Sequence, residues 1–148
     1  MKVIVQKAKK SSVLVDGKEF NSISFGLVLL VGFTYGDNEE ILEKMARKVV
    51  DLRIFEDDNK VMNKSVLDVG GEILSISQFT LYGDTSKGNR PSYLKALNGS
   101  DAIKLYNRFN ELLGKYAVTK PGKFGCDMVV NIVNDGPTTI ILEKSYEK

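Results

Sequence analysis

The sequence predicts a single α+β domain with a mixed, largely antiparallel sheet and two main helices. The hydrophobic period changes along the chain from that of strands to that of helices and back. The segments follow the order strands, helix, strand, helix, strands, without the regular alternation of strand and helix that a doubly wound fold requires. Residues 1–148 contain no linker or internal repeat, so one domain is expected.

The first 35 residues have the pattern of β-strands. Alternating apolar residues, as at Val13 and Val15, indicate strands that are half buried. Asp16-Gly17 follows, a pair typical of tight turns, and predicts a hairpin at this point. The stretch from Gly26 to Phe33 is apolar on both faces and is expected at the centre of a sheet.

Two later segments have the period of amphipathic helices. Asp37, with Glu40 three residues on, is typical of a capped helix start, and this helix is expected to run to about Arg53. The second helix is expected to begin after Ser100 as its cap and to end near Gly114. Its apolar positions are Ile103, Leu105, Tyr106, Phe109, Leu112 and Leu113.

The remaining apolar segments predict further strands. Residues 72–82 lie between the two helices and are expected to form one strand, although polar residues interrupt it. Residues 128–133 and 138–142 are expected to form two more strands, joined by a turn at Asn134-Asp135-Gly136-Pro137.

Histidine is absent from the chain. Its absence removes Ser-His-Asp and Cys-His catalytic pairs and every histidine-ligated metal site. Cys126 is the only cysteine, which excludes an intrachain disulfide and a thiolate zinc cluster. The net charge of +2 is too small to imply strong nonspecific binding to nucleic acid. No metal and no cofactor are therefore expected.

Nothing in the sequence predicts a membrane protein. The longest apolar run, from Leu27 to Val31, is far shorter than the roughly 20 residues that span a bilayer. No secretory signal pattern precedes the first expected strand, so we expect a cytoplasmic protein.

Two short segments are candidate functional sites, although each has an ordinary structural explanation. Ser77, Gln78 and Thr80 interrupt an apolar strand, and strand geometry would place Gln78 and Thr80 on one face. A solvated sheet face commonly has this pattern. Gly136-Pro137 has the composition of a reversal between strands, and only about 5–6% of X-Pro bonds in folded proteins are cis. The sequence pattern alone therefore does not decide whether either segment is functional.

Other candidates are weaker. The segment from Asp57 to Lys60 lacks the glycine and terminal glutamate of a calcium loop and is expected to be a polar turn. Gly70-Gly71 is too short to cradle a phosphate. Cys126 is expected to be packed, because a single cysteine is more often a small buried hydrophobe and, without histidine, only Lys123 or another cation could activate it. Five basic residues flank the two candidate segments: Lys87, Arg90, Lys95, Lys120 and Lys123. They either form an ordinary solvated surface or contact the phosphates of RNA.

Taken together, the motifs resemble those of the D-aminoacyl-tRNA deacylase, or D-tyrosyl-tRNA(Tyr) deacylase, family over almost the whole chain. The resemblance rests on Val5-Gln6, Leu52-Arg53-Ile54-Phe55-Glu56-Asp57, Met62-Asn63, Ser77 to Tyr82, Lys87-Gly88-Asn89-Arg90-Pro91, Gly122-Lys123-Phe124-Gly125 and Asn134-Asp135-Gly136-Pro137. It implies a hydrolase that cleaves the ester of D-aminoacyl-tRNA and rejects L-aminoacyl-tRNA. The implied partners are tRNA and a second copy of the chain, with no DNA.

The resemblance also implies a homodimer with a barrel-like sheet and a specific set of site residues. A cis Gly-Pro segment of one subunit is expected to reach into the pocket of the other. The implied roles are catalysis for Ser77, Gln78, Phe79 and Thr80, chiral selectivity for Gly136 and Pro137, contact with the terminal adenosine for Phe124 and Met128, and support of the Gly-Pro motif for Lys7 and Asn134.

A physical argument accompanies these expectations. A rigid backbone wall beside the α-carbon would exclude an L side chain by a clash, whereas glycine has no side chain to reject, so glycyl-tRNA should also be hydrolysed. Without histidine, catalysis would rest on correct positioning and on backbone oxyanion donors, for which the Phe79 and Thr80 amides are the candidates. The resemblance also implies help from the ribose 2′-hydroxyl of the substrate. Nothing in the sequence activates the Thr80 hydroxyl as a nucleophile, so a positioning role is expected for it.

Two positions depart from the family pattern. Lys7 stands where arginine is usual, and lysine lacks the bidentate fork of arginine. Thr138 stands where valine usually follows the Gly-Pro pair. These changes keep open an enzyme with shifted specificity for a small L-aminoacyl-tRNA. A noncatalytic RNA-binding module on the same scaffold is the other alternative.

Overall fold

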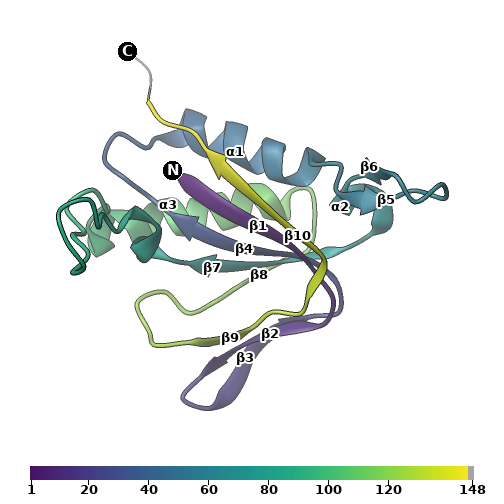
Figure 1. Ribbon diagram of the computed structural model, residues 1–148, viewed down its shortest axis with the longest axis horizontal. Helices are drawn as coiled ribbons and strands as arrows, with labels where there is room; N and C mark the ends of the chain where they lie inside the picture. Colours follow the sequence, from purple (N-terminus) through teal and green to yellow (C-terminus); the bar gives the residue numbers. More distant parts are fainter. Residues whose placement is uncertain (147–148) are drawn as a thin grey trace.

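A computed structural model describes residues 1–146. It contains a five-stranded sheet, a three-stranded sheet, a two-stranded ribbon and three α-helices in the described part of the chain (Figure 1). The strands are β1 Lys2–Ala8, β2 Ser11–Val15, β3 Lys18–Ile23, β4 Gly26–Gly32, β5 Phe55–Glu56, β6 Met62–Lys64, β7 Glu72–Ser77, β8 Thr119–Pro121, β9 Val129–Asn131 and β10 Asn134–Glu143. The helices are α1 Glu39–Asp51, α2 Val66–Val69, the 3₁₀ helix η1 Phe79–Tyr82 and α3 Gly99–Gly114.

The five-stranded sheet has the order β10-β1-β4-β7-β8. β1 pairs antiparallel with both β10 and β4, whereas β7 pairs parallel with both β4 and β8. β4 therefore lies at the centre, as its apolar sequence predicted, and its residues Leu27, Val28, Leu29 and Val31 are at most 1% exposed. The α+β class and the mixed sheet are confirmed, but this sheet is not largely antiparallel, because two of its four strand pairs are parallel.

The barrel-like sheet is wrong for the described residues. β2, β3 and β9 form a separate sheet of order β3-β2-β9, and no strand ladder joins it to the five-stranded sheet within residues 1–146. The two sheets instead pack through a small apolar cluster that includes Val13 and Ile23 from one sheet and Val28, Leu74 and Ile76 from the other. Side-chain packing rather than continuous hydrogen bonding holds the sheets together.

Helices α1 and α3 cover the opposite face of the five-stranded sheet (Figure 1). They are the two main helices that the sequence predicts, but their caps lie elsewhere. The Asn38 side chain accepts from the amide of Ile41 and caps α1, whereas Asp37 accepts from the amide of Thr34. The first helix ends at Asp51 because the backbone leaves the helical region at the next residue.

The cap of α3 is Asn98 rather than Ser100. The Asn98 Oδ1 atom accepts from the amide of Asp101 and from the Ser100 hydroxyl, at 3.0 and 2.8 Å. Asparagine and serine are both good caps, so sequence pattern alone places such a boundary only to within a few residues.

Two of the predicted turns, at Asp16-Gly17 and at residues 57–60, are confirmed. β2 and β3 form the expected hairpin, and both Asp16 and Gly17 have positive φ, as the tight turn between them requires. Asp57 accepts the amides of Asn59 and Val61 and forms the expected polar turn between β5 and β6. Gly70 ends the short helix α2 in the left-handed conformation.

Within residues 1–146, no helix is long and apolar enough to cross a bilayer.

Candidate functional site

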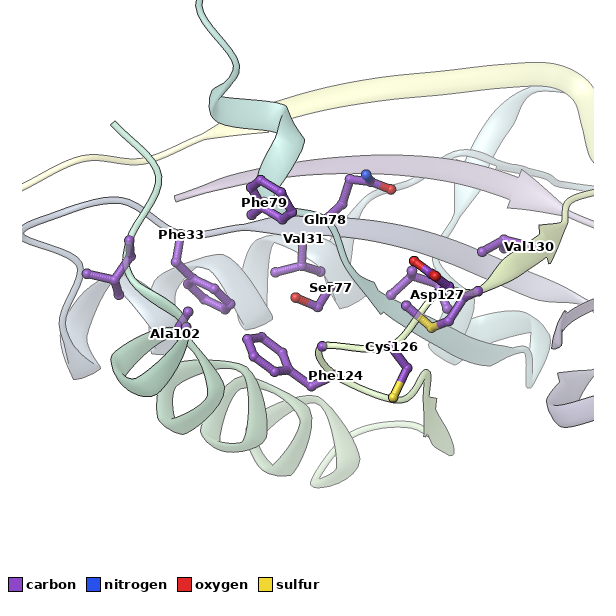
Figure 2. A pocket seen from close by; sticks show the side chains of 15 residues that line it. Val31, Phe33, Ser77, Gln78, Phe79, Ala102, Phe124, Cys126, Asp127 and Val130 are labelled. Atoms are coloured by element: carbon purple, nitrogen blue, oxygen red, sulfur yellow. The ribbon is translucent and has the colours of Figure 1, made fainter. Parts of the chain in front are cut away.

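A cavity of about 570 Å³ lies where β7 ends, between α3 and the segment that connects β8 to β9. Five of the predicted site residues line it: Ser77, Gln78, Phe79, Phe124 and Met128. The apolar part of its wall includes Val31, Phe33, Leu97 and Ala102. Figure 2 shows the side chains of Phe33, Ser77 and Phe124 pointing towards one another in this space.

The strand expected over residues 72–82 ends at Ser77. The amide of Gln78 makes the last hydrogen bond to the neighbouring strand, at 2.7 Å from the Val31 carbonyl oxygen. The chain then tightens into η1, with the Leu81 amide bonded to the Gln78 carbonyl oxygen. The prediction that Gln78 and Thr80 share a strand face is wrong for this reason. Their side chains still meet, because the Gln78 amide donates to the Thr80 hydroxyl.

The start of η1 leaves two backbone donors free. Within residues 1–146, the amides of Phe79 and Thr80 donate to no other atom, as is usual in the first turn of a helix. Phe79 lines the cavity, whereas Thr80 does not. The turn therefore leaves two free backbone N–H groups beside the cavity, one on the lining residue Phe79 and one on Thr80, which is the next residue beyond the lining.

The second wall of the cavity is the segment of residues 122–128. It begins at Gly122, whose amide donates to the Ser75 carbonyl oxygen at 2.9 Å. A Cβ atom on Gly122 would lie 2.9 Å from the Met128 sulfur and 3.1 Å from Ile76, so a larger residue would push this segment off β7. The close approach brings Phe124 and Met128 to the same cavity as Ser77.

Tyr106 supports both walls from outside the cavity. Its hydroxyl donates to the Ser75 carbonyl oxygen at 2.6 Å and accepts from the Gly122 amide at 3.2 Å. Its ring lies 5.8 Å from the ring of Phe124, measured between centroids. Burial raises the pKa of the Tyr106 hydroxyl, so the group stays protonated and able to donate.

Sequence reasoning placed Tyr106 only in the core of the second helix. The signal that could have identified its role is chemical: a buried tyrosine among leucine and phenylalanine usually needs a hydrogen-bond partner for its hydroxyl. The location of that partner depends on the packing of α3 against β7.

The Gly136-Pro137 segment is part of β10 and is not a turn between two strands. β9 pairs with β2, and β10 pairs with β1, so no hairpin forms across this segment. The register along β1 passes from Thr139 opposite Gln6 to Asn134 opposite Ala8. Residues 135–138 therefore form a bulge opposite a single residue, and the Gly136-Pro137 peptide bond in it is cis.

Asn134 and Lys7 hold the base of this bulge. The Asn134 side-chain amide donates to the carbonyl oxygens of Lys7 and Thr138, both at 3.0 Å. Lys7 thus supports the bulge through its backbone carbonyl group, and the residue as a whole is only 6% exposed. Gly136 and Pro137 are both exposed and do not line the cavity of their own chain.

The other candidates lie as follows. Cys126 is half buried and lines the cavity. Lys120 lies 3.2 Å from Glu72, and Lys95 lies 3.7 Å from Asp84. Within residues 1–146, no group of three or more histidine, cysteine, aspartate or glutamate side chains could hold a metal ion.

The comparisons with known proteins agree on one family. The model of the family described as D-Tyr-tRNA(Tyr) deacylase matches residues 4–143. A D-aminoacyl-tRNA deacylase of Bacillus cytotoxicus is 51% identical over 144 residues, which cover 97% of this chain and 99% of that protein. A D-aminoacyl-tRNA deacylase of Clostridium novyi is 49% identical over 148 residues, which cover 99% of each chain.

Two solved structures share the fold. One is named c-Myc DNA Unwinding Element Binding Protein; it is 43% identical, with a TM-score of 0.93, and the match covers 99% of this chain and 100% of the other. The other is described as a probable eukaryotic D-amino acid tRNA deacylase, with 17% identity, a TM-score of 0.80 and coverage of 95% and 97%. From the family match and the near half identity to these relatives, the chain belongs to the D-Tyr-tRNA(Tyr) deacylase family.

Proposed function

We propose that this protein hydrolyses the ester bond of D-aminoacyl-tRNA and releases the free amino acid and tRNA. The observation that carries the proposal is the shared cavity: Ser77, Gln78 and Phe79 line it together with Phe124 and Met128, which lie more than 40 residues away in sequence. Its volume of about 570 Å³ is within the usual range for small-molecule sites. We assign the cavity to the aminoacylated terminal adenosine, in a cytoplasmic enzyme.

The adenosine fits the aromatic and sulfur-containing wall. A nucleobase stacks well on an aromatic ring, and Phe124 presents its ring to the cavity while Tyr106 supports it from behind. Met128 is an adaptable apolar neighbour for the same ligand. Stacking there would place the ribose ester towards Ser77 and the start of η1.

Catalysis would use backbone donors and positioning, because the chain has no histidine. A water molecule forms the new bond to the carbonyl carbon, and the free amides of Phe79 and Thr80 stabilise the oxyanion. The ester C–O bond then breaks, and the departing ribose oxygen takes up the proton that the attacking water molecule loses. We assign the relay of that proton to the neighbouring ribose 2′-hydroxyl of the substrate.

Chiral selectivity is assigned to Gly136-Pro137 of a second copy of the chain. This bulge is exposed and is not part of its own cavity, which supports a role in another subunit. Its backbone would stand beside the α-carbon of the substrate and exclude an L side chain by a clash. The glycyl group of glycyl-tRNA has no side chain to clash with this backbone, so glycyl-tRNA would be hydrolysed.

A homodimer has an available surface on the sheet. Ile141 of β10 is 72% exposed, and Ile4 and Leu30 on the neighbouring strands are half buried. Exposed apolar residues on adjacent strands are suited to contact with another chain. The bulge lies on the same edge strand as Ile141, so pairing through this face would bring Gly136-Pro137 to the partner.

Two other functions are tested by the same measurements. Lys7 and Thr138 depart from the family pattern, which favours a shifted specificity for a small L-aminoacyl-tRNA; Thr138 is buried and is the last residue of the bulge. The similarity to a structure named as a DNA-binding protein favours a nucleic-acid-binding role without hydrolysis.

The deciding experiment compares deacylation of D-tyrosyl-, L-tyrosyl-, L-alanyl- and glycyl-tRNA by the purified protein. We expect rapid release from the D-tyrosyl and glycyl substrates and little from the L substrates. Equal rates on D- and L-tyrosyl-tRNA would remove the chiral assignment, and preference for L-alanyl-tRNA would support the shifted specificity. Binding of tRNA or duplex DNA without hydrolysis of any substrate would support the noncatalytic role.

A further inference from the structure

An exposed pair of aromatic rings lies at the rim of the cavity. Phe79, which lines the cavity, is 56% exposed, and Tyr93 is 42% exposed. Their ring centroids are 5.1 Å apart, and the rings meet at 67° in an edge-to-face contact. The neighbouring Leu94 is 87% exposed. Exposed apolar surface beside a cavity is a candidate contact site for a ligand or a partner.

The segment that carries Tyr93 is fixed next to the cavity. Asp84 and Ser92 exchange two backbone hydrogen bonds of 2.8 and 2.9 Å, which close the segment on itself. Its end is fixed by the Leu97 amide, which donates to the carbonyl oxygen of Phe33 at 3.0 Å. Both Phe33 and Leu97 line the cavity. Tyr93 is therefore held in place before any ligand arrives, so its binding would cost little ordering.

The tip of this segment is positively charged. Lys87 and Arg90 are exposed, and neither has an ion-pair or hydrogen-bond partner within residues 1–146. The only acidic residue of the segment, Asp84, lies 3.7 Å from Lys95. Two cations thus remain available for an anionic ligand, and phosphates of a nucleic acid are the natural match.

We propose that Tyr93, Lys87 and Arg90 form a platform, together with the outer edge of Phe79, for the unpaired nucleotides that precede the terminal adenosine of tRNA. The proposal rests on the proposed function, which assigns that adenosine to the cavity. Proteins bind single-stranded nucleic acid by stacking bases on aromatic rings while cations follow the backbone phosphates. The preceding nucleotides must leave the cavity across its rim. A second copy of this chain that paired through this same surface is a poorer occupant, because it would bring its own Lys87 and Arg90 to those of the first copy.

The test compares two substrates that share the ester and the adenosine. D-Tyrosyl-tRNA carries the preceding nucleotides, whereas the D-tyrosyl ester of adenosine lacks them. Tyr93→Ala should lower kcat/KM for the tRNA substrate about tenfold and change that for the adenosine ester by less than about twofold. If Tyr93→Ala is unstable, Tyr93→Leu replaces it, because leucine keeps an apolar side chain at this position. It should show the same difference between the two substrates.

The charged residues are tested by salt dependence. Lys87→Gln with Arg90→Gln should weaken binding of tRNA and reduce the slope of log affinity against log salt by about 1.4, the value for two phosphate contacts on a single strand. The matched controls are Tyr116→Ala, which removes a tyrosine that is 43% exposed after the end of α3, and Lys18→Gln with Lys48→Gln. These control variants should change neither the kcat/KM for either substrate nor the binding of tRNA.

Several results would overturn the platform. An equal loss on both substrates would mean that Tyr93 acts on the cavity, and no loss on tRNA would mean that it binds nothing. A change of oligomeric state in light scattering of Tyr93→Ala would assign this surface to contact between copies. Failure of the unmodified protein to hydrolyse either substrate would remove the proposed function as well, and so differs from failure of the Tyr93 variants alone.

Discussion

The cavity and the Gly136-Pro137 bulge are built in opposite ways. The cavity is held by the interior of the protein: the buried hydroxyl of Tyr106 joins α3, β7 and the start of the second wall at Gly122. The bulge lies on the edge strand β10, is exposed to solvent and is held at its base by the side chain of Asn134. Neither Gly136 nor Pro137 lines the cavity.

Under the proposed function, this difference separates substrate binding from chiral selection. A single chain assembles a cavity of suitable size for a ligand, whereas the bulge is assigned to a second copy of the chain. Substitutions in the cavity should therefore reduce hydrolysis of every substrate, and substitutions in the bulge should change which substrates are hydrolysed. The following substitutions test that separation.

The largest effect is expected for Phe124→Ala. Loss of the ring removes the stacking surface for the adenosine and the support that Tyr106 gives from behind, so kcat/KM should fall at least about tenfold on both D-tyrosyl- and glycyl-tRNA. Steady-state kinetics with the two substrates measures the loss. Phe20→Ala, at an exposed phenylalanine of β3, serves as the control. A loss confined to one substrate would contradict the separation.

Gly136→Ala should alter selectivity. Gly136 has a φ of +115°, which L residues rarely adopt, and a Cβ atom there would lie 2.6 Å from the Thr138 hydroxyl oxygen. The bulge must shift, so the ratio of D- to L-tyrosyl-tRNA hydrolysis should fall at least about tenfold while the D rate changes less. Gly114→Ala, where the added carbon meets open space, should leave the ratio unchanged. An unchanged ratio in Gly136→Ala would remove the bulge from chiral selection.

A smaller effect is expected for Tyr106→Phe. The variant keeps the ring but loses the hydroxyl that joins Ser75 and Gly122, whose direct backbone hydrogen bond remains. Thermal unfolding should show a loss of about 1 kcal/mol in stability, and KM should rise severalfold with a smaller change in kcat. Tyr82→Phe removes a hydroxyl from another buried tyrosine and should leave KM unchanged. A stability loss with no change in KM would reduce Tyr106 to a purely structural residue.

The smallest effect is expected for Thr80→Ala. The Thr80 hydroxyl accepts from Gln78 and does not line the cavity, while the backbone amide that we assign to the oxyanion is retained. Turnover of D-tyrosyl-tRNA should stay within about threefold of the unmodified protein, because only one exposed hydrogen bond is lost. Mass spectrometry that detects an acyl-enzyme on Thr80 would overturn this assignment.

The sequence alone determined the features that depend on neighbouring residues. The burial pattern of β4, the turn at Asp16-Gly17 and the two helices follow from local period and turn chemistry, and the structure confirms each. The composition also removed histidine-based catalysis. The motif order predicted which segments would be functional, and five of those residues line one cavity.

Tertiary structure decided the features that depend on distant partners. Strand β7 ends at Ser77, which pairs with Val31 and beyond which the chain tightens into η1. Residues 135–138 form a bulge because β10 pairs with β1 rather than with β9. The hydroxyl of Tyr106 finds Ser75 only when α3 packs on the sheet. Period and composition report how a residue relates to its neighbours along the chain, whereas a hydrogen bond between distant segments exists only after the chain has folded.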